Sequence, residues 1–255
     1  MVNLLRMDLY RMWKSRTFKI CLILSAALAL FTAPLGRLLY SLAATLSREA
    51  QPFPAETNLS VILADPFPML NLMLALISLC SFFYADLEHG YIKNIAGQMP
   101  MKGFTVLSKF LAAGVHNLIF AAVGIVGMLA GTLFVQRIVP DGGVADSIRV
   151  MILRLLLVQS ICAILLLVTA TFRGKSVGMI LAVLFGMGFT TPFYSGINYG
   201  LAQIFGPETN ILLYMPDIVM SDKNMSTVRA LLVAGVTGCV FLLPAIRIFD
   251  RKDVK

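Results

Sequence analysis

The stretch "FLAAGVHNLIFAAVGIVGMLAGTLFV", from Phe110 to Val135, contains no Asp, Glu, Lys or Arg. A helix of about 20 apolar residues crosses the hydrocarbon core of a bilayer, so this stretch predicts a membrane-spanning helix. Similar apolar runs recur along the chain of 255 residues. The sequence therefore predicts an all-α, polytopic membrane protein and not a soluble domain with one large core.

The composition supports the same class. Hydrophobic residues make up 58% of the chain and charged residues 13%, whereas soluble domains usually carry about 25% charged residues. In a soluble protein the net charge of +8 could indicate nucleic-acid binding. Here the basic residues flank apolar runs, which favours a role in topology and in contact with anionic lipid headgroups. We expect membrane lipid as a partner and no nucleic acid.

Six membrane-spanning helices are predicted from the apolar runs. Their approximate ranges are 20–40, 67–86, 106–135, 148–171, 177–198 and 229–248. No connector between them is long enough to hold a soluble domain, so residues 1–255 are expected to form a single transmembrane domain.

Residues 1–19 are predicted to form an amphipathic helix in the membrane interface. Leu5, Leu9, Met12 and Trp13 share one face, and the basic residues lie elsewhere around the helix. A cleaved signal peptide is the alternative. The apolar run that follows is long and ends without a clear small-residue cleavage site, so we expect a retained first span.

The distribution of Lys and Arg predicts the orientation. With the N-terminus in the cytoplasm, fourteen of these residues lie in inner segments and seven in outer segments or outer span ends. Cytoplasmic segments are enriched in basic residues, so both termini are expected inside. Arg37, Arg149 and Arg154 lie near outer span ends. They are expected to extend to the headgroups, with contact to an anionic substrate or partner as the alternative.

The outer segment 199–228 is unusually apolar between Pro207 and Pro216. Short half-inserted helices buried against protein are expected there. Small residues also recur at helical spacing, which lets helices approach closely in lipid. The pairs are Gly127 with Gly131, Gly174 with Gly178, and Gly196 with Gly200. Internal packing is the expected role of each pair, and a subunit interface is the alternative.

Catalytic and metal-binding patterns are absent from the sequence. The four cysteines each lie within a predicted span, without a C-x-x-C motif or a His/Cys cluster, so we expect apolar packing and no metal. The string "FRGKS" at 172–176 lacks the first glycine of a phosphate-binding loop, which is replaced by Thr169, and a preceding strand. His116 and Asn117 are expected to make hydrogen bonds between helices. We therefore expect no catalytic residue and no cofactor in this chain.

The predicted connector at 87–104 begins within the string "YADLEHGYIKNI", which runs from Tyr84 to Ile95. Gly90 can end the preceding helix. Tyr91 and Ile92 then face one way, and Lys93 and Asn94 lie on the other side. This pattern predicts a short amphipathic helix on the cytoplasmic surface. The alternatives are a solvated loop and a docking helix that passes motion from a soluble partner to the spans.

The order of these features resembles the export-type (type-2) permease subunits of bacterial ABC transporters. The resemblance covers nearly the whole chain but consists of loose motifs. It includes the segment "LYRMWKSRTF" before the first span and the tail "FDRKDVK" after the last. The single residues that carry it are Glu88, Gly90, Ile92, Lys93, Asn94, Pro100 and Lys109.

The resemblance implies a permease without its own ATPase. It implies a second permease subunit, identical or related, and cytoplasmic ABC ATPase subunits that bind ATP and Mg²⁺. The residues implied to couple to the ATPase are Glu88, Gly90, Tyr91, Ile92, Lys93 and Asn94. The implied location is the bacterial cytoplasmic membrane, and the implied substrate is peptide-like, an antibiotic or amphipathic. Apolar surfaces around Phe185, Phe189 and Phe193 are candidates for substrate contact.

Two other functions fit the same spans. A stand-alone secondary carrier or channel would work without an ATPase, although the spans lack the buried acidic residues that coupled carriers usually need. An intramembrane enzyme would need Glu88, His89 and His116 to converge.

Overall fold

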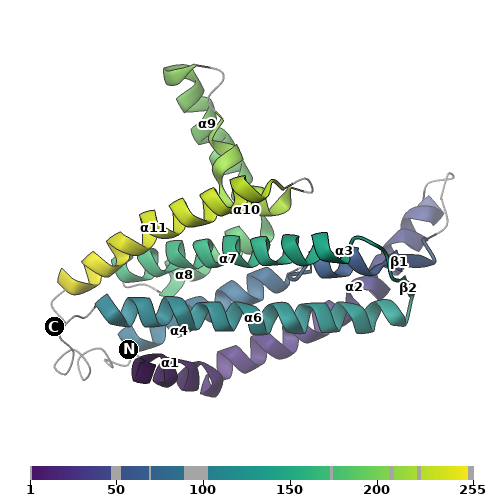
Figure 1. Cartoon of the computed structure of the whole chain (residues 1–255), viewed down its shortest axis with the longest axis horizontal. Helices are drawn as coiled ribbons and strands as arrows, with labels where there is room; N and C mark the ends of the chain where they lie inside the picture. Colours follow the sequence, from purple (N-terminus) through teal and green to yellow (C-terminus); the bar gives the residue numbers. More distant parts are fainter. Residues whose placement is uncertain are drawn as a thin grey trace.

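The computed structural model describes residues 2–46, 53–68, 70–88, 103–172, 175–206, 210–222 and 225–251. Within these ranges the chain is mostly helical, and its longest helices lie lengthwise beside one another (Figure 1). The long helices are α2 (Arg16–Leu46), α6 (Gly103–Leu133), α7 (Val144–Phe172) and α11 (Thr227–Arg251). The shorter elements are α1 (Val2–Lys14), β1 (Glu56–Asn58), α3 (Leu59–Ala64), α4 (Asn71–Glu88), β2 (Arg137–Val139), α8 (Lys175–Met187), α9 (Thr191–Phe205), the 3₁₀ helix η1 (Ile211–Tyr214) and α10 (Pro216–Ser221).

Four of the described helices, α2, α6, α7 and α11, are long and apolar enough to cross a membrane. The bent pair α8–α9 would add a fifth span. The chain therefore has the helices of a multi-pass membrane protein, with four or five candidate spans where the sequence predicted six.

The predicted second span, 67–86, is not among these candidates. Its helix, α4, has 18 residues and reaches about 27 Å at 1.5 Å per residue, whereas the hydrocarbon core is about 30 Å thick.

The predicted span at 177–198 is not one straight helix, because the helix ends at Met187 and restarts at Thr191. The two halves, α8 and α9, meet at 89°, and α9 points away from the bundle (Figure 1). Gly188 has φ = 71°, a backbone conformation that side chains with a Cβ rarely adopt. Pro192 then occupies the first turn of α9, a position that suits its fixed φ. This glycine and this proline explain the break.

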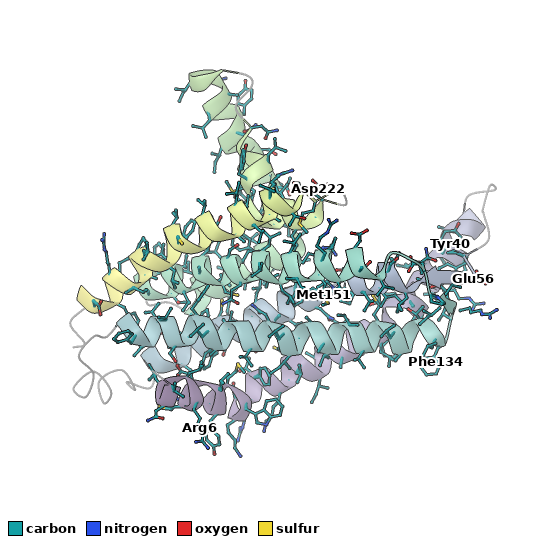
Figure 2. The ribbon with its side chains drawn as sticks, viewed as in Figure 1. Arg6, Tyr40, Glu56, Phe134, Met151 and Asp222 are labelled. Atoms are coloured by element: carbon teal, nitrogen blue, oxygen red, sulfur yellow. The ribbon has the colours of Figure 1, made fainter. Side chains whose placement is uncertain are left out.

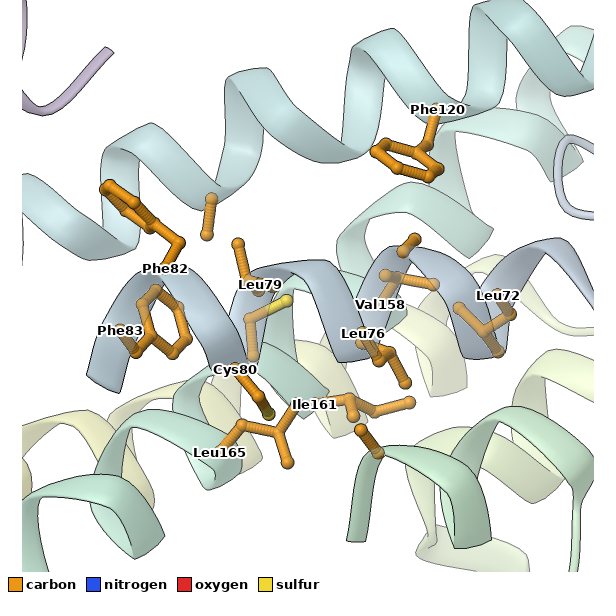
Figure 3. Close-up of a cluster of buried hydrophobic side chains, with 14 of the residues drawn as sticks. Leu72, Leu76, Leu79, Cys80, Phe82, Phe83, Phe120, Val158, Ile161 and Leu165 are labelled. Carbon is orange, nitrogen blue, oxygen red and sulfur yellow. The ribbon is translucent and has the colours of Figure 1, made fainter. Parts of the chain in front are cut away.

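The centre of the bundle is formed by α4, although it is one of the shorter helices. Its Leu76 and Leu79 are fully buried, and they pack in one cluster with Phe120 of α6 and Ile161 and Leu165 of α7 (Figure 3). Burial of apolar side chains on several sides gives α4 contacts with α2, α6, α7 and α8.

Two glycines of α6 allow close packing on α2. A Cβ on Gly131 would lie 2.0 Å from the Leu30 carbonyl oxygen, and one on Gly127 would lie 2.7 Å from Ala29 Cβ. Internal packing is therefore confirmed for this pair, as it is for Gly178, where a Cβ would meet Thr169 at 3.2 Å.

The other predicted glycine contacts have different outcomes. Gly174 lies outside the described residues. Internal packing is wrong for Gly196 and Gly200, because neither has a described atom within 4 Å of a Cβ position. Both lie on α9, which leaves the bundle after the bend.

A parallel strand pair closes the end of the bundle opposite α1. Strand β1 pairs with β2 in the register Glu56↔Arg137 and Asn58↔Val139. Next to this pair, the Ser60 hydroxyl donates to Asp141 Oδ2 at 2.5 Å. These contacts join the segment after α2 to the segment after α6.

Candidate functional site

The candidate site is the connector between α4 and α6, and the structure describes how its two ends are anchored. Gly90, Tyr91, Ile92, Lys93 and Asn94 lie outside the described residues, as does the segment up to residue 102. Glu88 is the last residue of α4. The end of the bundle where α4 ends and α6 begins also holds α1 and the C-terminal end of α11 (Figure 1). We call it the connector end, defined by Asp8, Gly103, Ser108, Lys109 and Asp250.

Asp8 docks helix α1 against the start of α6. Its side chain is buried, at 2% exposure. The Ser108 hydroxyl donates to Asp8 Oδ2 at 2.5 Å, and Arg11 Nη1 lies 3.7 Å from Oδ1. A carboxylate removed from water is stabilised only when such partners replace the lost hydration. The N-terminal helix is therefore attached to α6 by a specific polar contact as well as by apolar packing.

The predicted apolar face of the N-terminal helix is partly confirmed. Met12 is buried, and Leu5 and Leu9 pack against the main cluster. Trp13 instead is 56% exposed and faces outward. Asp8 was not predicted as a buried residue, although it is the only acidic residue among residues 1–19 and lies one turn from Met12.

Lys109 joins the start of α6 to the end of α4. Its side chain is buried, and Nζ donates to the Phe83 carbonyl oxygen at 3.3 Å. The same ammonium lies 5.3 Å from the centre of the Phe82 ring. A cation is favoured near the C-terminal end of a helix, where the helix dipole is negative, and over the face of an aromatic ring. The helix before the connector is thus held to the helix after it.

Asp250 links the last helix to the first residue of α6. The Gly103 backbone N–H donates to Asp250 Oδ1 at 2.5 Å, and a carboxylate at a helix N-terminus is favoured by the unpaired N–H groups there. A Cβ on Gly103 would lie 2.6 Å from Ile246 Cγ2. The connector end therefore fixes α1, α4, α6 and α11 to one another through charged side chains.

A second polar cluster lies deep in the bundle, where it joins α4, α6 and α7. His116 is fully buried, and its Nε2 lies 3.2 Å from Ser78 Oγ. Asn117 donates to Gln159 Oε1 at 3.1 Å, and Gln159 donates to the Phe110 carbonyl oxygen at 2.6 Å. Hydrogen bonds between helices, predicted for His116 and Asn117, are confirmed.

The three arginines near outer span ends differ in their surroundings. Arg154 points inward, with Nη1 2.7 Å from the Ala64 carbonyl oxygen and 3.2 Å from Asp65 Oδ1. Its extension to the headgroups stays a prediction. Arg149 pairs with Asp146 on the surface at 3.4 Å, and Arg37 lines an open pocket of about 630 Å³.

The cysteines do not form a metal site in the described part of the chain, where no group of three His, Cys, Asp or Glu side chains converges. Cys21, Cys80 and Cys162 are buried, as apolar packing predicts, whereas Cys239 is exposed. The Phe residues considered for substrate contact are also divided. Phe185 is buried, while Phe189 and Phe193 are 53% and 62% exposed.

Compared with known proteins, the chain matches no family model and no curated protein.

Proposed function

We propose that this chain is the permease subunit of an ATP-driven exporter of the ABC type, and that a separate cytoplasmic ATPase docks on the connector between α4 and α6. One observation carries this proposal. Both ends of the connector are held by charged side chains, the buried Lys109 at the end of α4 and Asp250 at the start of α6. A docking segment transmits motion only if its ends are fixed to the elements that must move.

The position of α4 supports a mechanical role. It lies in the centre of the main cluster, and a Cβ on Gly186 of α8 would lie 2.3 Å from Met73 Cα. Two helices in backbone contact cannot move independently, since packed interiors are not continuously deformable. Displacement of the connector would therefore shift α4 and, with it, the bent pair α8–α9.

The proposal includes a membrane arrangement. Both termini lie in the cytoplasm of a bacterial cell, α1 rests in the membrane interface, and the segment 199–228 is half inserted at the outer side. Two permease subunits pair and enclose the path of a peptide-like, antibiotic or amphipathic substrate. ATP and Mg²⁺ bind to the partner ATPase, and the permease supplies no catalytic residue.

The proposal is tested by affinity purification of the full chain in mild detergent, followed by assay of ATP hydrolysis in the purified complex. We expect an ABC ATPase to accompany the chain. Replacement of Glu88 by Lys together with Lys93 by Glu should abolish stimulated hydrolysis while the protein stays in the membrane. Asp146→Asn at the opposite end, where Asp146 is exposed, is the matched control and should leave hydrolysis unchanged.

Two results would overturn the proposal. One is unchanged complex formation and hydrolysis in the Glu88 and Lys93 double variant. The other is transport by liposomes that contain this chain alone, which would identify a stand-alone carrier or channel.

A further inference from the structure

A pocket of about 370 Å³ lies at the bend between α8 and α9 and is bordered by α10. Its volume falls within the range of about 300–1,000 Å³ that is typical of small-molecule sites. Apolar side chains form most of its wall, and Asp217 is the only charged residue that lines it. The apolar lining comes from Phe67, Leu72, Phe185, Met187, Ile218 and Met220.

Asp217 is buried, at 6% exposure. Its Oδ2 accepts a hydrogen bond from the Thr190 hydroxyl, and the Tyr194 side chain lies near the same carboxyl group. Asp217 Oδ2 therefore holds α10 to the start of α9. The Tyr194 hydroxyl and the backbone N–H groups of Asp217 and Ile218 also interact with the carboxyl group, but Oδ1 is buried and has no hydrogen bond of normal geometry among the described residues.

The nearby described arginines are engaged elsewhere. Arg154 lines the adjoining pocket, but it binds Ala64 and Asp65. Arg229 binds the Leu213 carbonyl oxygen and Asp222. None of the ion pairs within the described ranges includes Asp217. An ionised carboxylate in an apolar wall is costly unless a cation or several donors compensate it. Among the described residues, hydrogen-bond donors reach Asp217 but no cation pairs with it.

We propose that this pocket, defined by Asp217 and its apolar wall, binds an amphipathic organic cation. The apolar side chains would contact the hydrophobic part of the ligand, and the Asp217 carboxylate would pair with its positive charge. An apolar cavity with one charged group is the usual plan of a site that takes a hydrophobic ligand in a fixed orientation. The inference concerns binding and requires neither ATP nor a partner, so its failure is distinct from failure of the proposed function.

The ionisation of Asp217 also predicts how binding of the cation depends on pH. Burial raises the pKa of Asp217 above its ordinary value, and the Thr190 hydroxyl opposes that change. Protonation removes the negative charge, so a permanent cation binds more weakly as the pH falls through this pKa. The groups that face the carboxyl are Thr190 and Tyr194. Arg154 and Asp65 lie in the adjoining pocket, and Lys223 lies outside the described residues.

The test compares two probes of equal shape and opposite charge, tetraphenylphosphonium and tetraphenylborate. Equilibrium dialysis is performed on the full chain in detergent micelles, with protein-free micelles as the blank. We expect saturable binding of the cation and none of the anion, with cation affinity reduced at least tenfold by Asp217→Asn. Asp222→Asn is the matched control, because Asp222 follows α10 directly (Figure 2) and is bound by Arg229. It should keep the affinity of the unmodified chain.

Thermal unfolding in the same micelles shows whether each variant is folded. If Asp217→Asn does not fold, the pH dependence of cation binding to the unmodified chain tests the role of Asp217 instead. We expect the affinity to fall as the pH is lowered. Equal binding of both probes, no saturable binding of the cation, unchanged affinity in a folded Asp217→Asn variant or a pH-independent affinity would overturn the proposal.

Discussion

Buried charges at the connector end are the main finding at the scale of single residues. Asp8 and Lys109 are almost completely removed from solvent, yet each has a partner of suitable chemistry on another helix. Such contacts are specific because a shifted helix would leave a charge without compensation, at a cost of about 3–5 kcal/mol. They define how the N-terminal helix and the helix before the connector sit on α6.

The contact between Ser108 and Asp8 gives a direct stability prediction. Replacement of Ser108 by Ala removes a donor from a buried carboxylate and should lower the free energy of unfolding by about 1–3 kcal/mol. Unfolding in detergent measures this change. Ser41→Ala is the control, since the Ser41 hydroxyl is exposed and bonds within its own helix. Equal stability of the two variants would show that the Ser108 hydroxyl does not stabilise Asp8.

Sequence patterns predicted some of these residues and missed others. Lys109 was singled out as a residue at the start of the third span. His116 and Asn117 were correctly assigned to hydrogen bonds between helices. Asp8 and Asp217 were missed, because a single acid in a segment outside the predicted spans carries no sign of burial. Their burial results from packing between segments far apart in sequence, which local periodicity does not contain.

At the scale of elements, the surroundings of the glycines differ between helices. Gly131 of α6 lies against α2, whereas Gly200 of α9 has open space around it. Gly131→Ala should destabilise the protein by about 1–3 kcal/mol, because the new methyl group would overlap the Leu30 carbonyl of α2. Gly200→Ala on α9 should have no destabilising effect, since the space around it is open in this chain. Chemical unfolding of both variants in the same detergent tests the difference. A similar loss of stability in both variants would contradict the packing.

The bend between α8 and α9 gives a second prediction at this scale. Gly188→Ala should cost about 1 kcal/mol, because the positive φ of Gly188 disfavours any residue with a Cβ. Gly36→Ala is the control. Both positions have open space, but Gly36 lies within α2, so alanine there should preserve or increase stability. Thermal unfolding compares them, and a stable Gly188→Ala variant would argue against the bend.

The long helices were predictable because their apolar runs exceed the thickness of a bilayer. The predicted ranges 20–40, 106–135, 148–171 and 229–248 each fall on one of the four long helices, with differences of a few residues at most ends. The break at Gly188 was not predicted, since the apolar composition continues through it. A glycine with positive φ followed by Pro192 in the next helix changes the direction of the chain without changing its hydropathy.

At the scale of the whole molecule, the position of the N-terminal helix in the membrane is open to a spectroscopic test. Trp13 is the only tryptophan of the chain, and it is exposed on α1. If α1 lies in the interface, lipids brominated near the headgroup should quench its fluorescence more than lipids brominated near the end of the acyl chain. The variant Arg6→Glu, which changes the charge of the same helix, is the control for the effect of charge on the quenching of Trp13. Stronger quenching by the deep bromines would place α1 elsewhere.

The sequence also predicted one transmembrane domain, but it could not predict how the ends of the bundle are closed. Strands β1 and β2 have three residues each, and neither has the alternating pattern of a longer strand. Their pairing depends on two loops that are brought together by α2 and α6. Short pairings of this kind follow from the tertiary arrangement and leave almost no local signal.

The strand pair has a consequence for how α2 and α6 can move. Backbone hydrogen bonds between β1 and β2 join the segments that follow α2 and α6, and the glycines of α6 bring these two helices into close contact. A force applied at the connector end is therefore not expected to separate α2 from α6. We expect α2 and α6 to tilt together against α7 and α11, with the larger separation at the end far from the β1–β2 pair.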